Sequence, residues 1–270
     1  MATFNSPAGR VAKWRLAAAL FIFFAALNLA LADLTPADES ATNAFFAARA
    51  RIHYQHAQAQ YQADADNSTN AWNFARTCYD LADFSTNSNE RALLANQGIA
   101  ACHQLIASMP KSSPAHYYLA MNMGQLARTE WIGALSLVKE MEREFKTAVA
   151  LDAHFDFAGA DRNLGLLYLQ APTIGSIGSR RKAREFLEKA VKLAPEYPEN
   201  QLNLTEAFLK WNESDRAKLQ LNALDAIWSK AQANFTGEAW MQSWYDWSKR
   251  RAAAQKNVDE ASAKTGRASR

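Results

Sequence analysis

The side chains with the most specific chemistry in this sequence are two cysteines and five histidines. Cys78 and Cys102 do not have the spacing of a zinc motif, so they are either two buried thiols or, if the chain is exported, a disulfide pair. His53 and His56 are three residues apart and could share one face of a helix, but no third ligand lies near them in the sequence. We therefore expect neither a metal site nor a cofactor.

No spacing typical of a catalytic site is visible elsewhere. The Gly- and Ser-rich stretch 171–179 lacks the Gly-Lys-Ser/Thr ending and the preceding strand of a phosphate-binding loop. Glu140, Glu142 and Glu144 have the spacing of solvated helical charges that form i, i+4 pairs. Because no nucleophile, base and orienting group can be assembled, we expect a binding protein rather than an enzyme. A periplasmic hydrolase built on a helical superhelix is the less favoured alternative.

The elements that carry these side chains are expected to be helices. Gly and Pro are scarce, at 10 and 7 residues, and no alternating β-branched run is long enough for a strand. Apolar residues recur every three or four positions between polar breaks. The pattern predicts helices at about 36–64, 71–84, 89–109, 115–128, 129–151, 157–170, 180–194, 198–211, 214–233 and 238–256. Ser88 or Asn89 is expected to cap the third of them.

Helix endings and beginnings recur along the chain. Similar passages end at Pro110, Ala153 and Pro195, which are 43 and 42 residues apart. Each is followed by a helix with a small residue at its centre, and these residues are Gly124, Gly165 and Ala207. Small residues let paired helices approach closely, and a repeat of this length is typical of stacked helical hairpins.

Two stretches resemble the tetratricopeptide repeat in particular. The stretch 182–195 matches its second helix, and the pattern from Trp72 to Tyr79 is similar to its first helix. The usual period is shorter, about 34 residues, so longer helices or inserts must make up the difference. The sequence predicts an all-α, tetratricopeptide-like stack of helical hairpins (an α-solenoid) with extra terminal helices.

The N-terminus has the pattern of a secretory signal. Arg10, Lys13 and Arg15 precede an uninterrupted apolar run from Leu16 to Leu27, and Ala30 and Ala32 suit cleavage before Asp33. We expect an exported, periplasmic protein cleaved after Ala32, with an uncleaved anchor as the alternative. The domains are then a signal peptide at 1–32, the helical domain at 33–256 and a flexible basic tail at 257–270.

Removing the signal changes the charge. The whole chain carries 30 Lys and Arg against 27 Asp and Glu, for a net charge of +3, and three of those basic residues belong to the signal. The remaining chain is neutral, so we exclude nucleic acid as a partner.

Five passages carry a resemblance to a transport family. They are Tyr117–Gly124, Ala148–Asp152, Asn163–Tyr168, Ala171–Gly178 and Ala183–Ala190. Together they resemble the T-component family of TRAP transporters over roughly residues 70–235. The resemblance implies a periplasmic adaptor that associates with a solute-binding protein. Unlike the best-known members, this chain has no cysteine to acylate after its leader.

A weaker resemblance runs to the regulator of microtubule dynamics proteins. The shared positions are Trp72, Ala75, Arg76, Tyr79, Tyr118, Asn122 and Gly124. The apparent signal peptide favours an exported protein over this cytoplasmic or mitochondrial class.

The first helix of each pair should line the concave side of the stack. The side chains expected there are Asn73, Thr77, Asp80, Tyr118, Met121, Gln125, Arg128, Arg162, Leu166, Leu169, Leu204, Phe208 and Trp211. Such a mixture suits a peptide or a small hydrophobic or amphipathic ligand, although the same periodicity also fits ordinary core positions. A general cell-envelope scaffold is the plainer alternative.

Three tryptophans near the C-terminus form a stripe. Trp240, Trp244 and Trp247 share one helix face, which is typical of a terminal helix that covers the end of a stack. A pocket wall or a contact between copies in a homo-oligomer is the functional alternative.

Overall fold

The computed structural model describes residues 36–130 and 133–268, which form helices and their connections and, within these ranges, no strand. The helices are α2 (Pro36–Ala63), α3 (Ser68–Phe84), α4 (Ser88–Ser108), α5 (Ser113–Ala127), α6 (Ala134–Leu151), α7 (Phe155–Gln170), α8 (Arg180–Leu193), α9 (Pro198–Lys210), α10 (Ser214–Asn234), the short η2 (Glu238–Trp240) and α11 (Met241–Ala268). The predicted all-α class is confirmed.

Asparagine caps two of the early helices. The Asn67 side chain accepts hydrogen bonds from the backbone of Thr69 and Asn70, so α3 begins three residues before its predicted start. Asn87 does the same at α4, which corrects the predicted cap at Ser88 or Asn89. The side-chain oxygen of Asn87 accepts hydrogen bonds from the backbone amides of Asn89 and Glu90, which have no partner within the helix.

The helices pack as antiparallel hairpins, and the consecutive pairs are α3 with α4, α5 with α6, α7 with α8, and α9 with α10. Gly165 shows why small residues recur: a Cβ added there would lie 2.6 Å from Cγ of Leu187 on the paired helix α8. Gly124 faces Met141 of α6 in the same way, and Ala207 is fully buried. The predicted role of these three positions is confirmed.

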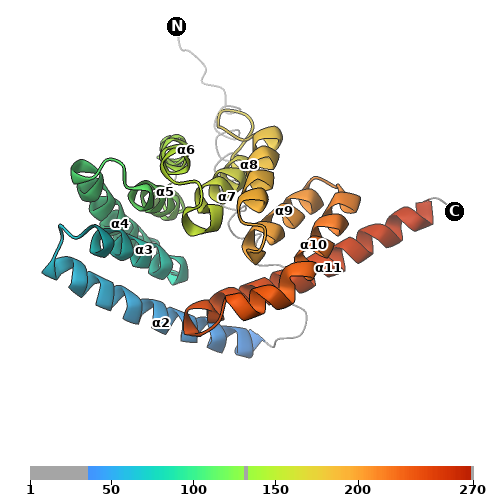
Figure 1. The fold of residues 1–270 in the computed structure, drawn as a ribbon, viewed down its shortest axis with the longest axis horizontal. Coiled ribbons are helices and arrows are strands. Elements are labelled where there is room, and N and C mark those ends of the chain that lie inside the picture. Colours follow the sequence, from blue (N-terminus) through green and yellow to red (C-terminus); the bar gives the residue numbers. More distant parts are fainter. Residues whose placement is uncertain (1–35, 131–132, 269–270) are drawn as a thin grey trace, which may run out of the picture.

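The first helices of the pairs form one side of the stack. Helix α5 contacts α3 and α7, and α7 contacts α9, whereas α4, α6, α8 and α10 lie on the other side. Helices α2 and α11 lie along the side of α3 and α9 (Figure 1), and α2 packs on α3 while α11 packs on α9 and α10. The N-terminal ends of α2 and α11 meet near the middle of the molecule.

Two predicted boundaries are wrong. Helix α6 begins at Ala134 rather than at residue 129, because Arg128 and Thr129 form a turn that ends α5. Helix α11 continues to Ala268 and not to about 256, so most of the predicted flexible tail 257–270 is helical. Burial of Val258, four residues after the buried Ala254, extends the apolar side of this helix past the predicted end.

The predicted signal peptide lies outside the described residues. Within residues 36–130 and 133–268, no helix has the length and apolar character needed to cross a bilayer.

Candidate functional site

A cavity of about 670 Å³ lies between α2, α3, η2 and the start of α11. We call it the acidic cavity, because four carboxylates and two guanidinium groups line it. These charged residues are Asp80, Asp83, Glu238, Asp246, Arg49 and Arg76. The remaining lining includes His53, His56, Asn73 and Thr77. The cavity is open to solvent and has the size of an ordinary ligand site.

Helix α3 supplies one wall of the acidic cavity through its polar face. Asn73, Thr77, Asp80 and Asp83 recur every three or four residues, so they lie along one stripe of the helix. Residues such as Phe74 on the other face are buried in the core of the stack. One amphipathic helix therefore both holds the fold together and presents two carboxylates to the cavity.

Carboxylates face the acidic cavity from opposite walls. Burial raises the pKa of Asp80 to about 6, with the charge of Asp83 adding to the rise and Arg76 opposing it. Loss of hydration likewise raises the pKa of Asp246 on α11 to about 6, although the residue stays exposed to solvent; the charges of Glu199 and Asp83 add to the rise and those of Arg250 and Lys249 oppose it. Among the described residues, no Lys or Arg lies within ion-pair distance of Asp246. A cation entering the cavity would offset this mutual repulsion.

Helix α5 holds Asp83 in place. Arg128 donates to the Asp83 carboxylate at 2.7 Å, and Gln125 donates to the same oxygen at 3.3 Å. Arg128 also donates to the side chain of Gln125 at 3.1 Å. The second hairpin thus fixes a carboxylate of the first hairpin at the edge of the acidic cavity.

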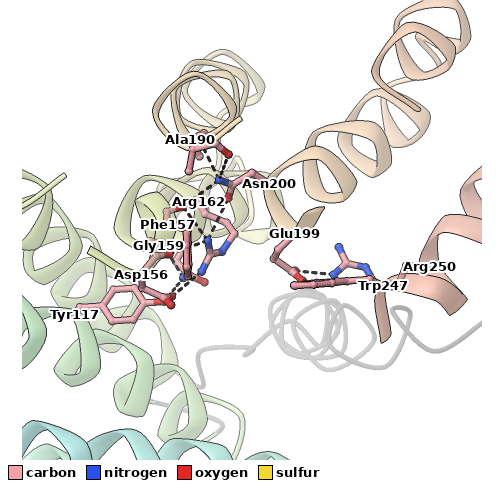
Figure 2. A network of polar contacts seen from close by, with 12 residues as sticks. Tyr117, Asp156, Phe157, Gly159, Arg162, Ala190, Glu199, Asn200, Trp247 and Arg250 are labelled. Atoms are coloured by element: carbon pink, nitrogen blue, oxygen red, sulfur yellow. Dashed lines mark hydrogen bonds and ion pairs between the residues drawn. The ribbon is translucent and has the colours of Figure 1, made fainter. Parts of the chain in front are cut away.

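A second polar cluster fixes α11 against α9. Arg250 donates to Glu199 at 2.6 Å, and Trp247 donates to the same carboxylate group at 2.7 Å (Figure 2). Arg250 also donates to both oxygens of Glu206 at 2.8 Å. Burial alone would raise the pKa of Glu199, but Arg250 and Arg162 outweigh it and the pKa is lowered. This anchor positions Asp246, which precedes Trp247 by one residue, over the acidic cavity.

A left-handed turn joins the two halves of the stack. Asp156, Phe157 and Ala158 have φ values of 51°, 54° and 61°, each of which costs about 1–2 kcal/mol for a residue other than glycine. Arg162 holds the turn: it donates to the Asp156 carboxylate at 2.7 Å and to the Phe157 carbonyl at 3.3 Å (Figure 2). Tyr117 donates to the same carboxylate at 2.6 Å.

The turn places the rings of Phe155 and Phe157 in different parts of the core. Phe155 packs edge-on against Tyr117, with ring centres 5.4 Å apart, in the core of the N-terminal half. Phe157 stacks on Tyr197 at 4.4 Å and meets Phe235 at 5.4 Å in the C-terminal half. The left-handed turn therefore sets how the N-terminal half of the stack is oriented relative to the C-terminal half.

The structure separates the predicted concave residues into three groups. Asn73, Thr77 and Asp80 line the acidic cavity, and Gln125 and Arg128 reach its edge through Asp83. The others do not line it. They are the buried Tyr118, Arg162, Leu204 and Phe208 and the partly buried Met121, Leu166, Leu169 and Trp211.

Each residue outside the cavity has a structural contact that explains its position. Tyr118 stacks on Trp72 with ring centres 6.0 Å apart, and Phe208 packs against Trp211 at 5.9 Å. Arg162 belongs to the left-handed turn. Met121 packs against the N-terminal core, and Leu166 and Leu169 pack against the C-terminal core.

Sequence reasoning missed Asp83 and Asp246. Asp83 continues the stripe of Asn73, Thr77 and Asp80 by one more turn, so the α3 pattern could have included it. Asp246 gave no comparable signal, because its place depends on where α11 packs.

The two cysteines are free thiols in the structure, and both are fully buried. Burial raises the pKa of Cys78 and of Cys102, so the reactive thiolate form is disfavoured. In the part of the chain that the structure describes, no three His, Cys, Asp or Glu side chains are placed to hold a metal ion.

One family model matches the sequence, that of regulator of microtubule dynamics protein 1-3, over residues 34–158. The match covers 125 of the 270 residues, just under half of the chain, and spans α2 to the beginning of α7. This is the family to which the weaker of the two sequence resemblances pointed. No curated protein matches the sequence.

Solved structures resemble the fold. A thermophilic tetratricopeptide-repeat protein from Thermus thermophilus is 19% identical with a TM-score of 0.57, over 77% of this chain and 91% of that one. MamA is 18% identical with a TM-score of 0.46, over 74% of this chain and 98% of that one. The likeness to the Thermus thermophilus protein shows that the chain has a tetratricopeptide-repeat-like helical fold, as its repeats predicted.

Proposed function

We propose that this protein is a non-enzymatic adaptor, and that its acidic cavity binds a basic side chain, Lys or Arg, carried by a partner protein. The observation that carries the proposal is the placement of Asp80, Asp83 and Asp246 on two walls of one solvent-open cavity. Four carboxylates against two guanidinium groups give the lining a formal charge of −2 with its histidines neutral. These two guanidinium groups are paired with Glu238 and Asp80, and Arg128 at the edge of the cavity is paired with Asp83. Among the described residues, Asp246 is the lining carboxylate without an ion pair.

A protein segment fits this site better than a small apolar molecule. The volume of about 670 Å³ accommodates side chains of a partner, and its lining combines charged groups with apolar ones such as Phe46 and Tyr79, which suits the long apolar stem and charged end of Lys or Arg. A guanidinium or ammonium group would form charge-assisted hydrogen bonds with the carboxylates, which are stronger than neutral ones. Stacked helical pairs offer extended surfaces suited to binding peptides.

The test is a calorimetric titration of the full chain with a short amidated alanine peptide that contains one Arg and one Lys. A peptide with Gln at both positions is the matched control. We expect Asp80→Asn and Asp246→Asn each to weaken binding of the basic peptide by about fivefold or more, the size expected for a charge-assisted contact. Glu196→Gln, outside the cavity, should leave the affinity unchanged.

Equal affinity for the two peptides would contradict the proposal. So would normal binding by both aspartate variants, since the cavity would then not be the site.

A second candidate is more specific: an exported adaptor that associates with the solute-binding protein of a TRAP transporter. The leader-like residues 10–32 and the Ala171–Gly178 motif support it. The mass of the mature protein tests export, since cleavage after Ala32 would leave Asp33 as the first residue. Purification from the cell envelope tests the partner, and a repeated failure to recover a solute-binding protein would remove this candidate.

A further inference from the structure

Three arginines gather around one glutamate where the start of α8 meets the turn between α9 and α10. Arg180 and Arg184 of α8 each donate a hydrogen bond to the carboxylate of Glu213. Arg216 of α10 forms an ion pair with the same carboxylate at 3.4 Å. We call these four residues the arginine cluster. None of them lines the acidic cavity, and Figure 1 shows α8 across the stack from α2.

Two aromatic rings orient the guanidinium groups of the arginine cluster. The guanidinium carbon of Arg184 lies 5.0 Å from the ring centre of Trp211 and 5.5 Å from that of Phe208. Arg180 lies over the Trp211 ring at 5.4 Å, and Arg216 lies over the Phe208 ring at 6.0 Å. Guanidinium groups and rings therefore alternate. A guanidinium that lies over a ring keeps the N–H groups at its edge available as hydrogen-bond donors.

The ends of two helices fix the backbone of the arginine cluster. Helix α9 ends at Asn212, whose φ is 59°, and its amide donates to the Leu209 carbonyl at 3.0 Å. The amide of Glu213 donates to the Phe208 carbonyl at 2.9 Å. This pair of hydrogen bonds is a Schellman motif, which sets the position of Glu213. On the other side, the Ser179 side chain caps the start of α8. The arginines therefore stand on well-defined helix ends.

The arginine cluster carries more positive charge than its own carboxylate neutralises. Three guanidinium groups against one carboxylate leave a formal charge of +2. Residues 180–185 and 208–216 together hold six basic and three acidic residues, a net charge of +3, although the chain from residue 33 onward is neutral. The side chains of Arg180 and Arg216 are 55% and 57% exposed, so a partner can reach them.

We propose that the arginine cluster binds an acidic side chain, Glu or Asp, presented by a partner protein. Glu213 shows that the three guanidinium groups accommodate a carboxylate. The exposed edges of Arg180 and Arg216 would donate to a second one, because a guanidinium holds a carboxylate through two parallel hydrogen bonds. The second carboxylate would also offset the repulsion among the three cations. The site shares no residue with the acidic cavity, so it does not rest on the ligand proposed there.

The test is a calorimetric titration of the full chain with a short alanine peptide, acetylated and amidated, that contains two adjacent Glu residues. The same peptide with two Gln residues is the matched control. We expect the Glu peptide to bind at least about fivefold more tightly than the Gln peptide. Arg180→Gln and Arg216→Gln should each weaken binding of the Glu peptide by about fivefold or more, the size expected for a charge-assisted contact.

Two further variants separate the arginine cluster from general electrostatic attraction. Arg180→Lys keeps the charge but replaces the planar fork by a point charge, so it should still weaken binding by about twofold or more. Lys218→Gln removes a basic residue from the same helix as Arg216, two positions further along, where it does not share a face with Arg216. It should leave the affinity unchanged. Circular dichroism of each variant shows whether it is folded.

Equal affinity for the Glu and Gln peptides would overturn the proposal. So would a loss in Lys218→Gln as large as that in Arg216→Gln, because binding would then follow the overall charge. A peptide with one phosphoserine in place of the two Glu residues tests a phosphate as the ligand, and binding about tenfold tighter than the Glu peptide would overturn the carboxylate. Arg216→Gln should bind the basic peptide of the acidic cavity as the wild type does, so the two proposed sites can fail separately.

Discussion

The carboxylates of the acidic cavity are the residues on which the account depends. Asp246 has a pKa of about 6 in the folded protein against an ordinary value of 3.8. The folded state therefore holds more protons than the unfolded state between these values. It follows that this group lowers the free energy of unfolding as the pH rises through about 6, and that its full destabilising effect is present at neutral pH.

Asp246→Asn should therefore make the protein more stable at neutral pH. We expect its Tm to exceed that of the wild type at about pH 7.5 and the difference to shrink towards about pH 3, where the wild-type carboxyl is mostly protonated in both states. Thermal unfolding followed by circular dichroism measures this. Asp259→Asn, on the same helix but away from the cavity, should shift Tm equally at both pH values. A destabilised D246N at neutral pH would show that this carboxylate is already paired.

Arg250 should matter far more to stability than the arginine next to it. Arg250→Met leaves Glu199 and Glu206 half-buried without their cation, which should lower the free energy of unfolding by about 2–3 kcal/mol. Arg251→Met removes the more exposed pair with Asp225 and the contact of the guanidinium with the Trp228 ring at 4.5 Å, and should cost about 1 kcal/mol. Urea unfolding of both variants tests this, and equal losses would mean that the anchor of α11 is not where the structure places it.

At the scale of elements, the close approach of paired helices depends on their small residues. Gly165→Ala should destabilise by about 1–3 kcal/mol, because its Cβ would meet both the side chain and the backbone of Leu187 on α8. Gly124→Ala meets only the flexible end of Met141 at 3.1 Å, so the better helix propensity of alanine should leave it neutral or slightly stabilised. Chemical denaturation measures the free energy of unfolding of the two variants. A larger loss in Gly124→Ala than in Gly165→Ala would contradict the packing of α7 on α8.

The sequence predicted the elements better than their ends. Periodicity located every hairpin, because each helix has one buried face, and the spacing of Gly124, Gly165 and Ala207 located the pairs. The left-handed turn at residues 156–158 could not be predicted, since Asp156, Phe157 and Ala158 do not favour this conformation. Arg162 holds it from within α7, and Tyr117 of α5 and Asn200 of α9 hold it from other helices.

The candidate site was also predictable only in part, because it depends on contacts between residues that are far apart in the sequence. The polar stripe of α3 is a local pattern, so Asn73, Thr77 and Asp80 could be named from sequence. The opposite wall comes from α11, more than 150 residues later, and local periodicity does not say where a terminal helix packs. The tryptophan stripe is divided between two helices, since Trp240 ends η2 whereas Trp244 and Trp247 belong to α11; Trp247 is 1% exposed where α11 packs on α9 and α10.

At the scale of the whole molecule, two ion pairs join α2 to η2 and α11, and they should make this association sensitive to ionic strength. The Debye length falls from about 14 Å to about 4 Å between about 0.05 M and 0.5 M salt, so the Glu39–Lys249 and Arg49–Glu238 pairs should weaken. A cysteine introduced by Asn73→Cys lies on the α3 wall of the acidic cavity, and its rate of alkylation by uncharged iodoacetamide reports access to the cavity. We expect this rate to become faster at high salt. In R49E the salt effect should be smaller, because one pair is already lost. A rate independent of salt would mean that apolar contacts alone hold α2 on α11.

The most direct test of the central claim is the affinity of the full chain for the basic peptide as a function of pH. If ionised Asp80 and Asp246 hold the cation, the affinity should be constant above about pH 7 and should fall as the pH drops through about 6. The variant D80N/D246N, which keeps His53 and His56 in the cavity lining, should bind weakly and show a smaller pH dependence. An affinity that stays constant from about pH 8 to pH 5 would contradict the claim that these carboxylates form the binding site.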